Sequence, residues 1–400
     1  MGGARGRARG ERGACGGSRP AGGGATCRSR EHRARHVLGV AFGEPRGGAR
    51  GRRRLATVFL AGAACRRGGR RSAGGTGLRV LSDPWRHWAA TGLWSRVLWP
   101  MSVLYCALAI LRRRLYTVGV CTVQRLPVPV IVVGNVTVGG TGKTPFVLWL
   151  CARLSAAGLR PGIVLRGYGG RNRGVLRVDA HSDPGCVGDE AVLLARHAPG
   201  PVIAARDRVA GAQALVEAGC DVIVADDGLQ HYRLGRCLEI GILDGVRRFG
   251  NGLCLPGGPL REPRTRWDRL DFRVTQGQAA AGEWAMGLAG DRAYAVGGHA
   301  EVGLADLRRV HAVAGIGHPQ RFFRALEGWG LEVIAHPFPD HHRYSAEDLQ
   351  FDTDDPVVMT EKDAVKCESL GRSGLWYVPV RAVVDEELAR RILARLKPRS

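Results

Sequence analysis

The sequence contains almost no lysine: four lysines stand beside 55 arginines among 400 residues. The first 80 residues hold none of the four; 19 arginines and 21 glycines fill half of that segment, with only three acidic residues. Its net charge is therefore +16, the larger part of the +23 of the whole chain. Without an apolar periodicity to offset the ordering entropy of a fold, residues 1–80 are expected to be a disordered tail. The arginine bias is typical of a GC-rich coding region, which favours a misassigned start.

Aromatic residues are also scarce in this tail, where Phe42 and Phe59 are the only two. Arg/Gly-rich segments that bind RNA combine their positive charge with aromatic side chains on which bases stack. We therefore expect no nucleic-acid partner, and RNA binding by residues 1–80 stays an alternative that a deletion would test. Serine is sparse as well, which disfavours a transit peptide.

Paired cysteine motifs are absent from the sequence. The chain has 11 cysteines, an odd number, and no two of them form a C-x-x-C pair. This pattern supports neither a zinc site nor a disulfide framework. It agrees with a reducing, cytosolic environment.

No apolar run reaches the roughly 20 residues that a membrane-spanning helix needs. The nearest candidate, residues 94–111, is interrupted by Pro100, carries tryptophans in its first half, and is followed at once by three arginines at 112–114. These features are typical of a helix that lies in the membrane interface, where arginines meet anionic head groups. We predict that residues 83–127 form a membrane-associated helical segment; a buried core helix is the alternative.

Residues 128–150 have the pattern of an apolar strand, a glycine-rich turn and a helix, in that order. Backbone N–H groups of such a turn and of the following helix point at an anion, as in a phosphate-binding loop. Lys143 would neutralise the outer phosphates of a nucleoside triphosphate, and the Thr144 hydroxyl would hold a magnesium ion. The match is imperfect, because Thr137 stands where GxxxxGK[ST] has its first glycine. The predicted nucleotide-binding residues are Thr137, Val138, Gly139, Gly140, Thr141, Gly142, Lys143 and Thr144.

Apolar runs alternate with polar or helical stretches from residue 128 onward, which predicts an α/β fold with a parallel sheet flanked by helices on both faces. The pattern loosens between residues 275 and 298 and resumes near residue 310. We therefore expect a P-loop core over residues 128–305 and a second, smaller α/β lobe over residues 306–400. The expected strands are 128–133, 162–165, 202–205, 222–225, 240–243, 310–316, 331–335 and 356–360, and the expected helices are 189–194, 209–218 and 319–329.

Two acidic pairs lie at the ends of expected elements. Asp226-Asp227 ends an apolar strand, and carboxylates at the carboxyl edge of such a sheet hold magnesium beside a phosphate loop. Asp189-Glu190 begins a helix, where acids cap free N–H groups, but Asp189 is also a candidate base for a hydroxyl that accepts a phosphoryl group. Three histidines near these motifs are weaker candidates, because a lone histidine is more often structural: His231, His341 and His342.

Eight motifs occur in an order that resembles the tetraacyldisaccharide 4′-kinase family, the lipid A kinases of Gram-negative bacteria. They read VGNVTVGGTGKTP, LRGYGG, GDEA, ARDRVAGA, ADDGLQH, LPGGPLREP, FPDHHRY and MTEKDAVK, and the resemblance covers about residues 83–395. The resemblance implies ATP- and magnesium-dependent phosphorylation of the 4′-hydroxyl of a tetraacyl glucosamine disaccharide 1-phosphate, at the cytoplasmic face of the inner membrane. A small hydroxyl residue at the position of Thr137 also fits the family.

The resemblance further implies roles for individual residues. Asp189 would be the general base, oriented by His341, and Lys143 would act catalytically on the β and γ phosphates. The metal ligands would be Thr144 and Asp226 or Asp227. The residues that line the site would be Glu190, Gln230, His231, Arg261 and Glu262.

A P-loop NTPase switch or metallochaperone of the KGGxGKT class is the alternative, because VGGTGKT is similar to that loop. Val138 stands where that class has its signature lysine, however, and the cysteines lack metal-ligand spacing.

An acylated acceptor does not leave a bilayer readily, since each buried CH₂ is worth ~0.8 kcal/mol. We therefore expect a peripheral or monotopic enzyme whose partners are its lipid substrate and the inner-membrane surface, with no obligate protein partner.

Overall fold

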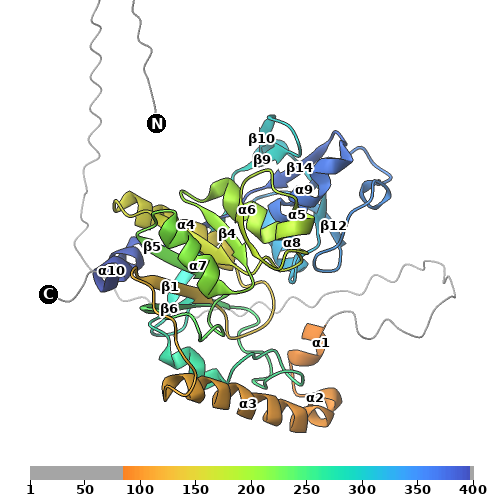
Figure 1. Ribbon diagram of the computed structural model, residues 1–400. Helices are drawn as coiled ribbons and strands as arrows, with labels where there is room; N and C mark the ends of the chain where they lie inside the picture. Colours follow the sequence, from red (N-terminus) through yellow and green to blue (C-terminus); the bar gives the residue numbers. More distant parts are fainter. Residues whose placement is uncertain (1–83, 397–400) are drawn as a thin grey trace, which may run out of the picture. The chain divides into compact units, whose positions relative to one another are not determined.

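The computed structural model describes residues 84–396, all within the unit Ala73–Ser400 (Figure 1). The predictions for residues 1–80 fall outside the described residues. Two sheets organise the described part of the chain, one of nine strands and one of six. We call the part with strands β1–β8 and β15 the first lobe, and the part with strands β9–β14 the second lobe.

The sheet of the first lobe has the order β15-β8-β7-β6-β1-β5-β2-β4-β3. Strands β8 to β4 in this order run parallel, and β15 and β3 pair antiparallel at the two edges. The strands are β1 (Val130–Gly134), β2 (Pro161–Leu165), β3 (Val175–Val178), β4 (Val202–Ala205), β5 (Val222–Asp226), β6 (Leu238–Asp244), β7 (Phe272–Gln276), β8 (Trp284–Ala289) and β15 (Arg381–Val384).

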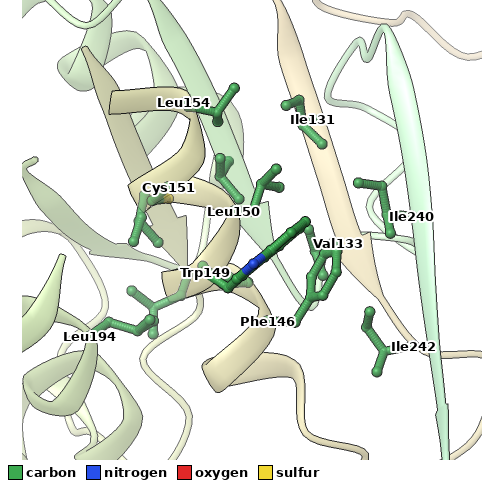
Figure 2. Packing of buried hydrophobic residues seen from close by; sticks show 14 of the residues in the cluster. Ile131, Val133, Phe146, Trp149, Leu150, Cys151, Leu154, Leu194, Ile240 and Ile242 are labelled. Atoms are coloured by element: carbon green, nitrogen blue, oxygen red, sulfur yellow. The ribbon is translucent and has the colours of Figure 1, made fainter. Parts of the chain in front are cut away.

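Helices cover both faces of this sheet. Strand β1 is buried throughout, and its alternate residues enter two cores, with Ile131 and Val133 in one and Val130 and Val132 in the other. Figure 2 shows the first core, where Phe146 and its neighbours on α4 face strands β1 and β6. This arrangement confirms the predicted fold class. The helices of the first core are α4 (Lys143–Ala156), α6 (Asp189–His197) and α10 (Glu386–Leu396), with the short α5 (Pro184–Val187) beside α6; α7 (Arg208–Glu217) lies in the second.

The sheet of the second lobe has the order β10-β9-β14-β13-β11-β12, in which β14, β13, β11 and β12 run parallel. The proposed boundary at residues 305 and 306 stays a proposal: β9 and β10 precede it, and the chain returns to the first lobe with β15. The strands are β9 (Arg292–Ala295), β10 (Glu301–Gly303), β11 (Arg309–Ala314), β12 (Glu332–Pro337), β13 (Val357–Thr360) and β14 (Leu375–Val378); the helices are α8 (Pro319–Gly328) and α9 (Glu361–Cys367).

The region of loosened sequence pattern, residues 275–298, contains strands β8 and β9. In β8, WAMGLA, only Met286 is fully buried, and small residues occupy half of the positions. Glycine and alanine carry little apolar signal, so a strand of this kind leaves no clear periodicity. The structure therefore has more strands here than the sequence indicates.

The apolar stretch at residues 94–111 is divided between two helices. After α1 (Pro84–Trp88), α2 (Leu93–Val97) ends before α3 (Trp99–Thr117), and Pro100 lies in the first turn of α3, where its missing N–H breaks no helical bond. Ser102 is buried, and its Oγ accepts a hydrogen bond from Gly257 N at 2.9 Å, which ties α3 to the first lobe. Within residues 84–396, no helix combines the length and the apolar character needed to cross a bilayer.

Candidate active site

A cavity of about 1290 Å³ lies at the carboxyl ends of β1 and β5. Both lobes contribute to its wall, as expected for a ligand site in an α/β sheet. Residues 138–144 of the predicted phosphate loop line it, whereas Thr137 is buried behind them and forms a bridge with Leu260. Helix α3 contributes Tyr105, Leu108 and Arg112, and the second lobe contributes Arg321, His341 and Lys362.

The phosphate loop takes its shape from glycines with left-handed backbone. Gly139 has φ +105° and Gly142, the residue before α4, has φ +85°. Asn135, buried at the end of β1, donates from Nδ2 to the carbonyl oxygen of Gly139 at 3.2 Å. Lys143 Nζ in turn donates to Asn135 Oδ1 at 3.3 Å and lies 3.6 Å from Asp227 Oδ1. The lysine therefore begins its helix with its ammonium held inside the cavity.

The two aspartates that follow β5 differ in environment. Asp226 is buried, its Oδ1 finds no hydrogen-bond partner among the described residues, and burial raises its pKa to about 7 although Lys143 opposes this. Asp227 is partly exposed, with φ +49°, and Arg261 Nη1 contacts both of its carboxylate oxygens at 2.9 Å. Burial opposes ionisation of Asp227, but Lys143 and Arg261 outweigh it and lower its pKa.

This donor set fits a divalent cation. The unpaired Oδ1 of Asp226 is a buried acceptor, and Thr144, in the first turn of α4, lines the same cavity. Among residues 84–396 no group of three His, Cys, Asp or Glu side chains forms a metal cage. Mg²⁺ is usually held by one or two carboxylates together with substrate phosphates, so such a cage is not required.

Asp189 and His341 meet across the two lobes. Asp189 is the first residue of α6 and is buried, and His341, in the loop after β12, brings its Nδ1 to 3.1 Å from Asp189 Oδ2. Burial opposes ionisation of the aspartate, but the hydrogen bond from His341 and the charge of Lys362 lower its pKa. The same hydrogen bond raises the pKa of His341. The pair therefore favours a carboxylate beside an imidazolium.

Most of the remaining predicted residues line the cavity. Gln230 donates from Nε2 to the carbonyl oxygen of Asn135 at 3.2 Å. Burial lowers the pKa of His231 to about 4 and raises the pKa of Glu262, whose carboxylate accepts a hydrogen bond from Tyr232. His342 is separate from this set, because its Nε2 contacts Asp348 Oδ2 at 3.1 Å. The predicted lining residues at the cavity wall are Glu190, Gln230, His231, Arg261 and Glu262.

Sequence reasoning gave no role to several charged or polar residues of the site. Arg208 begins α7, and its Nη2 donates to the carbonyl oxygen of Asp226 at 3.3 Å; burial lowers its pKa to about 10. Arg321 of α8 donates to the carbonyl oxygen of Gly140 at 3.2 Å. Lys362 lies within MTEKDAVK and Arg208 within ARDRVAGA, so the ordered motifs contained the signal, although no local chemistry marked these positions.

The family model for tetraacyldisaccharide-1-P 4′-kinase (LpxK) matches residues 94–397. The chain belongs to this family. Tetraacyldisaccharide 4′-kinase of Alkalilimnicola ehrlichii is 54% identical to it over 301 residues, covering 74% of this chain and 91% of that protein. The corresponding protein of an Azoarcus species is 50% identical over 323 residues, covering 78% and 94%.

A solved tetraacyldisaccharide 4′-kinase, LpxK from Aquifex aeolicus in complex with ATP, has the same fold. The two structures align with a TM-score of 0.64 at 30% identity, over 76% of this chain and 99% of that one. These matches confirm the resemblance drawn from the ordered motifs. Membership of the tetraacyldisaccharide 4′-kinase family also decides against the switch or metallochaperone alternative.

Proposed function

We propose that this chain transfers the γ-phosphoryl group of ATP to the 4′-hydroxyl of a tetraacyl glucosamine disaccharide 1-phosphate. The observation that carries this proposal is the Asp189–His341 pair: Asp189 is buried, and its partner His341 lines the same cavity as Lys143 and the rest of the phosphate loop. Phosphoryl transfer needs a triphosphate site and, beside it, a group that receives the proton of the attacking hydroxyl. The relatives named tetraacyldisaccharide 4′-kinase support the choice of acceptor.

Residues 137–144 bind the triphosphate in this proposal. The N-terminus of α4 directs its free N–H groups and its dipole toward the phosphates. The ammonium of Lys143, 3.6 Å from Asp227 in the structure, follows the charge on the migrating group. Arg261 also contacts Asp227, so the carboxylate keeps a counter-charge when the lysine moves to the phosphates.

Thr144, Asp226 and Asp227 are the residues that would hold Mg²⁺. The cation would supply neutralisation of the negative charge that develops on the phosphate oxygens. Asp226 contributes its otherwise unpaired Oδ1 and Thr144 its hydroxyl, both at the wall that the phosphate loop forms. Glu190, Gln230, His231, Arg261 and Glu262 are proposed to line the acceptor and nucleotide space.

Asp189 is the proton acceptor in the proposed reaction. Its Oδ2 accepts the hydrogen bond from His341, and its Oδ1 accepts one from Glu190 N at 2.9 Å, so the carboxylate plane is held from two sides. Each carboxylate oxygen retains a further lone pair for the hydroxyl proton. His341 thereby orients the base and stabilises its ionised form.

The acceptor lipid is proposed to reach the cavity along α3 while the enzyme lies on the cytoplasmic face of the inner membrane. Trp94 of α2 and Leu104 of α3 are 56% and 61% exposed, with further apolar side chains beside them. Leu108 and Arg112 of the same helix line the cavity. An apolar surface next to arginines suits a peripheral or monotopic protein on anionic lipid.

Transfer of labelled γ-phosphate tests the function directly. The full chain is incubated with [γ-³²P]ATP and a tetraacyl disaccharide 1-phosphate in mixed micelles, with the Asp189→Asn variant as the matched control. We expect label in the lipid with wild type and almost none with the variant. ATP hydrolysis without lipid labelling would refute the proposal.

A further inference from the structure

Lys362, the second residue of α9, is almost enclosed by acidic side chains. Its Nζ lies 3.2 Å from Glu190 Oε1 of the first lobe and 3.6 Å from Asp340 Oδ1 of the second, and its side chain is 15% exposed. Burial opposes the charge on the lysine, but Glu190, Asp189 and Asp340 outweigh it and raise the pKa of Lys362. The ammonium therefore stays charged at the point where the two lobes meet.

The backbone that carries Lys362 is fixed by buried polar contacts. Thr360 is the N-cap of α9, and its Oγ1 accepts from Asp363 N at 3.2 Å. Asp363 is fully buried, and its Oδ2 accepts from Thr360 Oγ1 at 2.6 Å and from Gly315 N at 2.9 Å. A capped helix whose first-turn aspartate is held through Oδ2 fixes the backbone from which the long lysine side chain extends.

Helix α9 also packs against α6, the helix that begins with Asp189. At its far end, Arg196 Nη2 of α6 donates to Glu368 Oε2 at 2.8 Å, and Val365 of α9 lies in the core of the first lobe. The two helices are therefore joined at one end by an ion pair and at the other by Lys362 and Glu190. Lys362 on α9 and the proposed base Asp189 on α6 therefore lie on two helices that pack against each other.

We propose that Lys362 is a positioning residue of the phosphoryl transfer: it is the counter-charge that holds acidic side chains of the two lobes together beside Asp189. This role rests on the proposed function of the site. Three cations act on Asp189, namely His341 from the loop after β12, and Lys362 and Lys366 from α9. Of the two lysines, Lys366 forms an ion pair with Asp363, with 2.7 Å between its Nζ and Asp363 Oδ1.

The role has a consequence for pH dependence. The charge of Lys362 lowers the pKa of Asp189, against the effect of burial, together with His341. A base with a lowered pKa stays ionised as the solution is acidified, and removal of one cation makes it protonate at a higher pH. The acid limb of kcat should therefore move to higher pH when Lys362 is made neutral.

The experiment measures kcat against pH for lipid phosphorylation by wild type, Lys362→Gln, Lys362→Arg and Glu368→Gln. The last variant is the matched control, because it breaks the α6–α9 ion pair without changing a charge in the cavity. We expect the acid limb of Lys362→Gln to shift to higher pH, so that on acidification the variant loses kcat before wild type does, through earlier protonation of the base. Lys362→Arg and Glu368→Gln should keep the wild-type limb.

Two results would overturn the role. One is an acid limb of kcat in Lys362→Gln that coincides with that of wild type. The other is an equal shift of the acid limb in Glu368→Gln, which would mean that the packing of α6 against α9 alone is responsible. If Lys362→Gln does not fold, the double variant Lys362→Gln/Asp340→Asn, which removes a charge from each side of one bridge, should show the same shift. Absence of transfer by wild type overturns the proposed function with it, whereas normal wild-type transfer and an unmoved limb overturn only the role of Lys362.

Discussion

At the scale of the residue, two adjacent carboxylates of the site differ in pKa because only Asp227 is in contact with Arg261. Asp226 and Asp227 are neighbours in sequence, yet burial raises the pKa of Asp226 to about 7 while Lys143 and Arg261 overcome burial and lower that of Asp227. At neutral pH Asp227 is therefore fully ionised, whereas Asp226 becomes fully ionised only when a further positive charge lies nearby. A cation bound at Asp226 would favour its carboxylate form, since opposite charge stabilises the ionised state.

Replacing Lys143 with alanine should remove the charge that follows the migrating phosphoryl group. Loss of such transition-state stabilisation costs several kcal/mol, or roughly 10²-fold and more in rate. Folding should be preserved, because Arg261 continues to pair with Asp227. Steady-state kinetics with thermal unfolding as control checks this, and retention of more than about a tenth of wild-type turnover would contradict the phosphate-loop assignment.

The Asp189–His341 pair should behave as one unit. Asp189→Asn keeps the size of the side chain but removes the proton acceptor, so kcat should fall by ~10² to 10⁴ with little change in ATP affinity. His341→Ala should impair the same step, because it removes the 3.1 Å contact that orients the carboxylate. A double-mutant cycle in kcat gives the coupling. Fully multiplicative losses would show that the two residues act separately.

At the scale of the element, the start of α4 depends on a residue without a side chain. Gly142 has φ +85°, and a Cβ there would lie 3.0 Å from Met286 Cε. Both features bear on the phosphate loop, because Gly142 immediately precedes Lys143.

Gly142→Ala should therefore weaken ATP binding and lower the free energy of unfolding by about 1–2 kcal/mol or more, since a left-handed non-glycine residue is strained. Gly158→Ala, just after α4, is the matched control, because Gly158 has φ +84° but no atom within 4 Å of the Cβ position. Nucleotide titration and urea unfolding measure the two effects. Equal loss of ATP affinity in both variants would exclude a local effect on the loop.

The exposed apolar face of α2 and α3 should determine how much of the protein binds to membranes. Trp94→Ser combined with Leu104→Ser removes apolar surface worth ~25 cal/mol per Å² on insertion, so binding to anionic vesicles should fall while ATP binding stays unchanged. Val175→Ser, in edge strand β3, is the control for an exposed apolar residue elsewhere. Vesicle sedimentation compares them, and unchanged binding of the double variant would argue against interfacial docking.

Strands with continuous apolar runs could be predicted from the sequence, and others could not. The expected strand at 202–205 coincides with β4, and that at 222–225 differs from β5 by one residue, because central parallel strands are buried on both faces. Strand β8 gave no such signal, since its small residues leave only Met286 fully buried.

Local chemistry indicated candidate residues only where they are contiguous in sequence, whereas the pairing of Asp189 with His341 was implied by the resemblance alone. The phosphate loop and the Asp226-Asp227 pair each form one continuous motif, so a short stretch of sequence is enough to indicate their chemistry. Arg208 and Lys362 contact residues of other segments, Asp226 and Glu190, and no spacing rule identifies a side chain whose partner lies in another element.

At the scale of the whole molecule, the family match begins at residue 94, beyond the Arg/Gly-rich segment. Deleting residues 1–80 removes a net charge of +16, and all of the proposed catalytic residues lie after it. Lipid phosphorylation should persist, with little change in kcat relative to the full chain. A parallel assay of both proteins checks this. Loss of activity on deletion would make the segment functional.

The first lobe is completed by β15 and α10, which are synthesised last, so its stability depends on the end of the chain. Strand β15 pairs with β8, with Arg381 opposite Ala289, only after the whole second lobe has been made. Helix α10 then adds Leu388 and Ile392 to the core that α4 began. Until the ribosome releases these last residues, β8 is an unpaired edge strand, open to association with other chains. A stop codon shortly before residue 381 would therefore yield an aggregating protein even though every proposed catalytic residue had been translated.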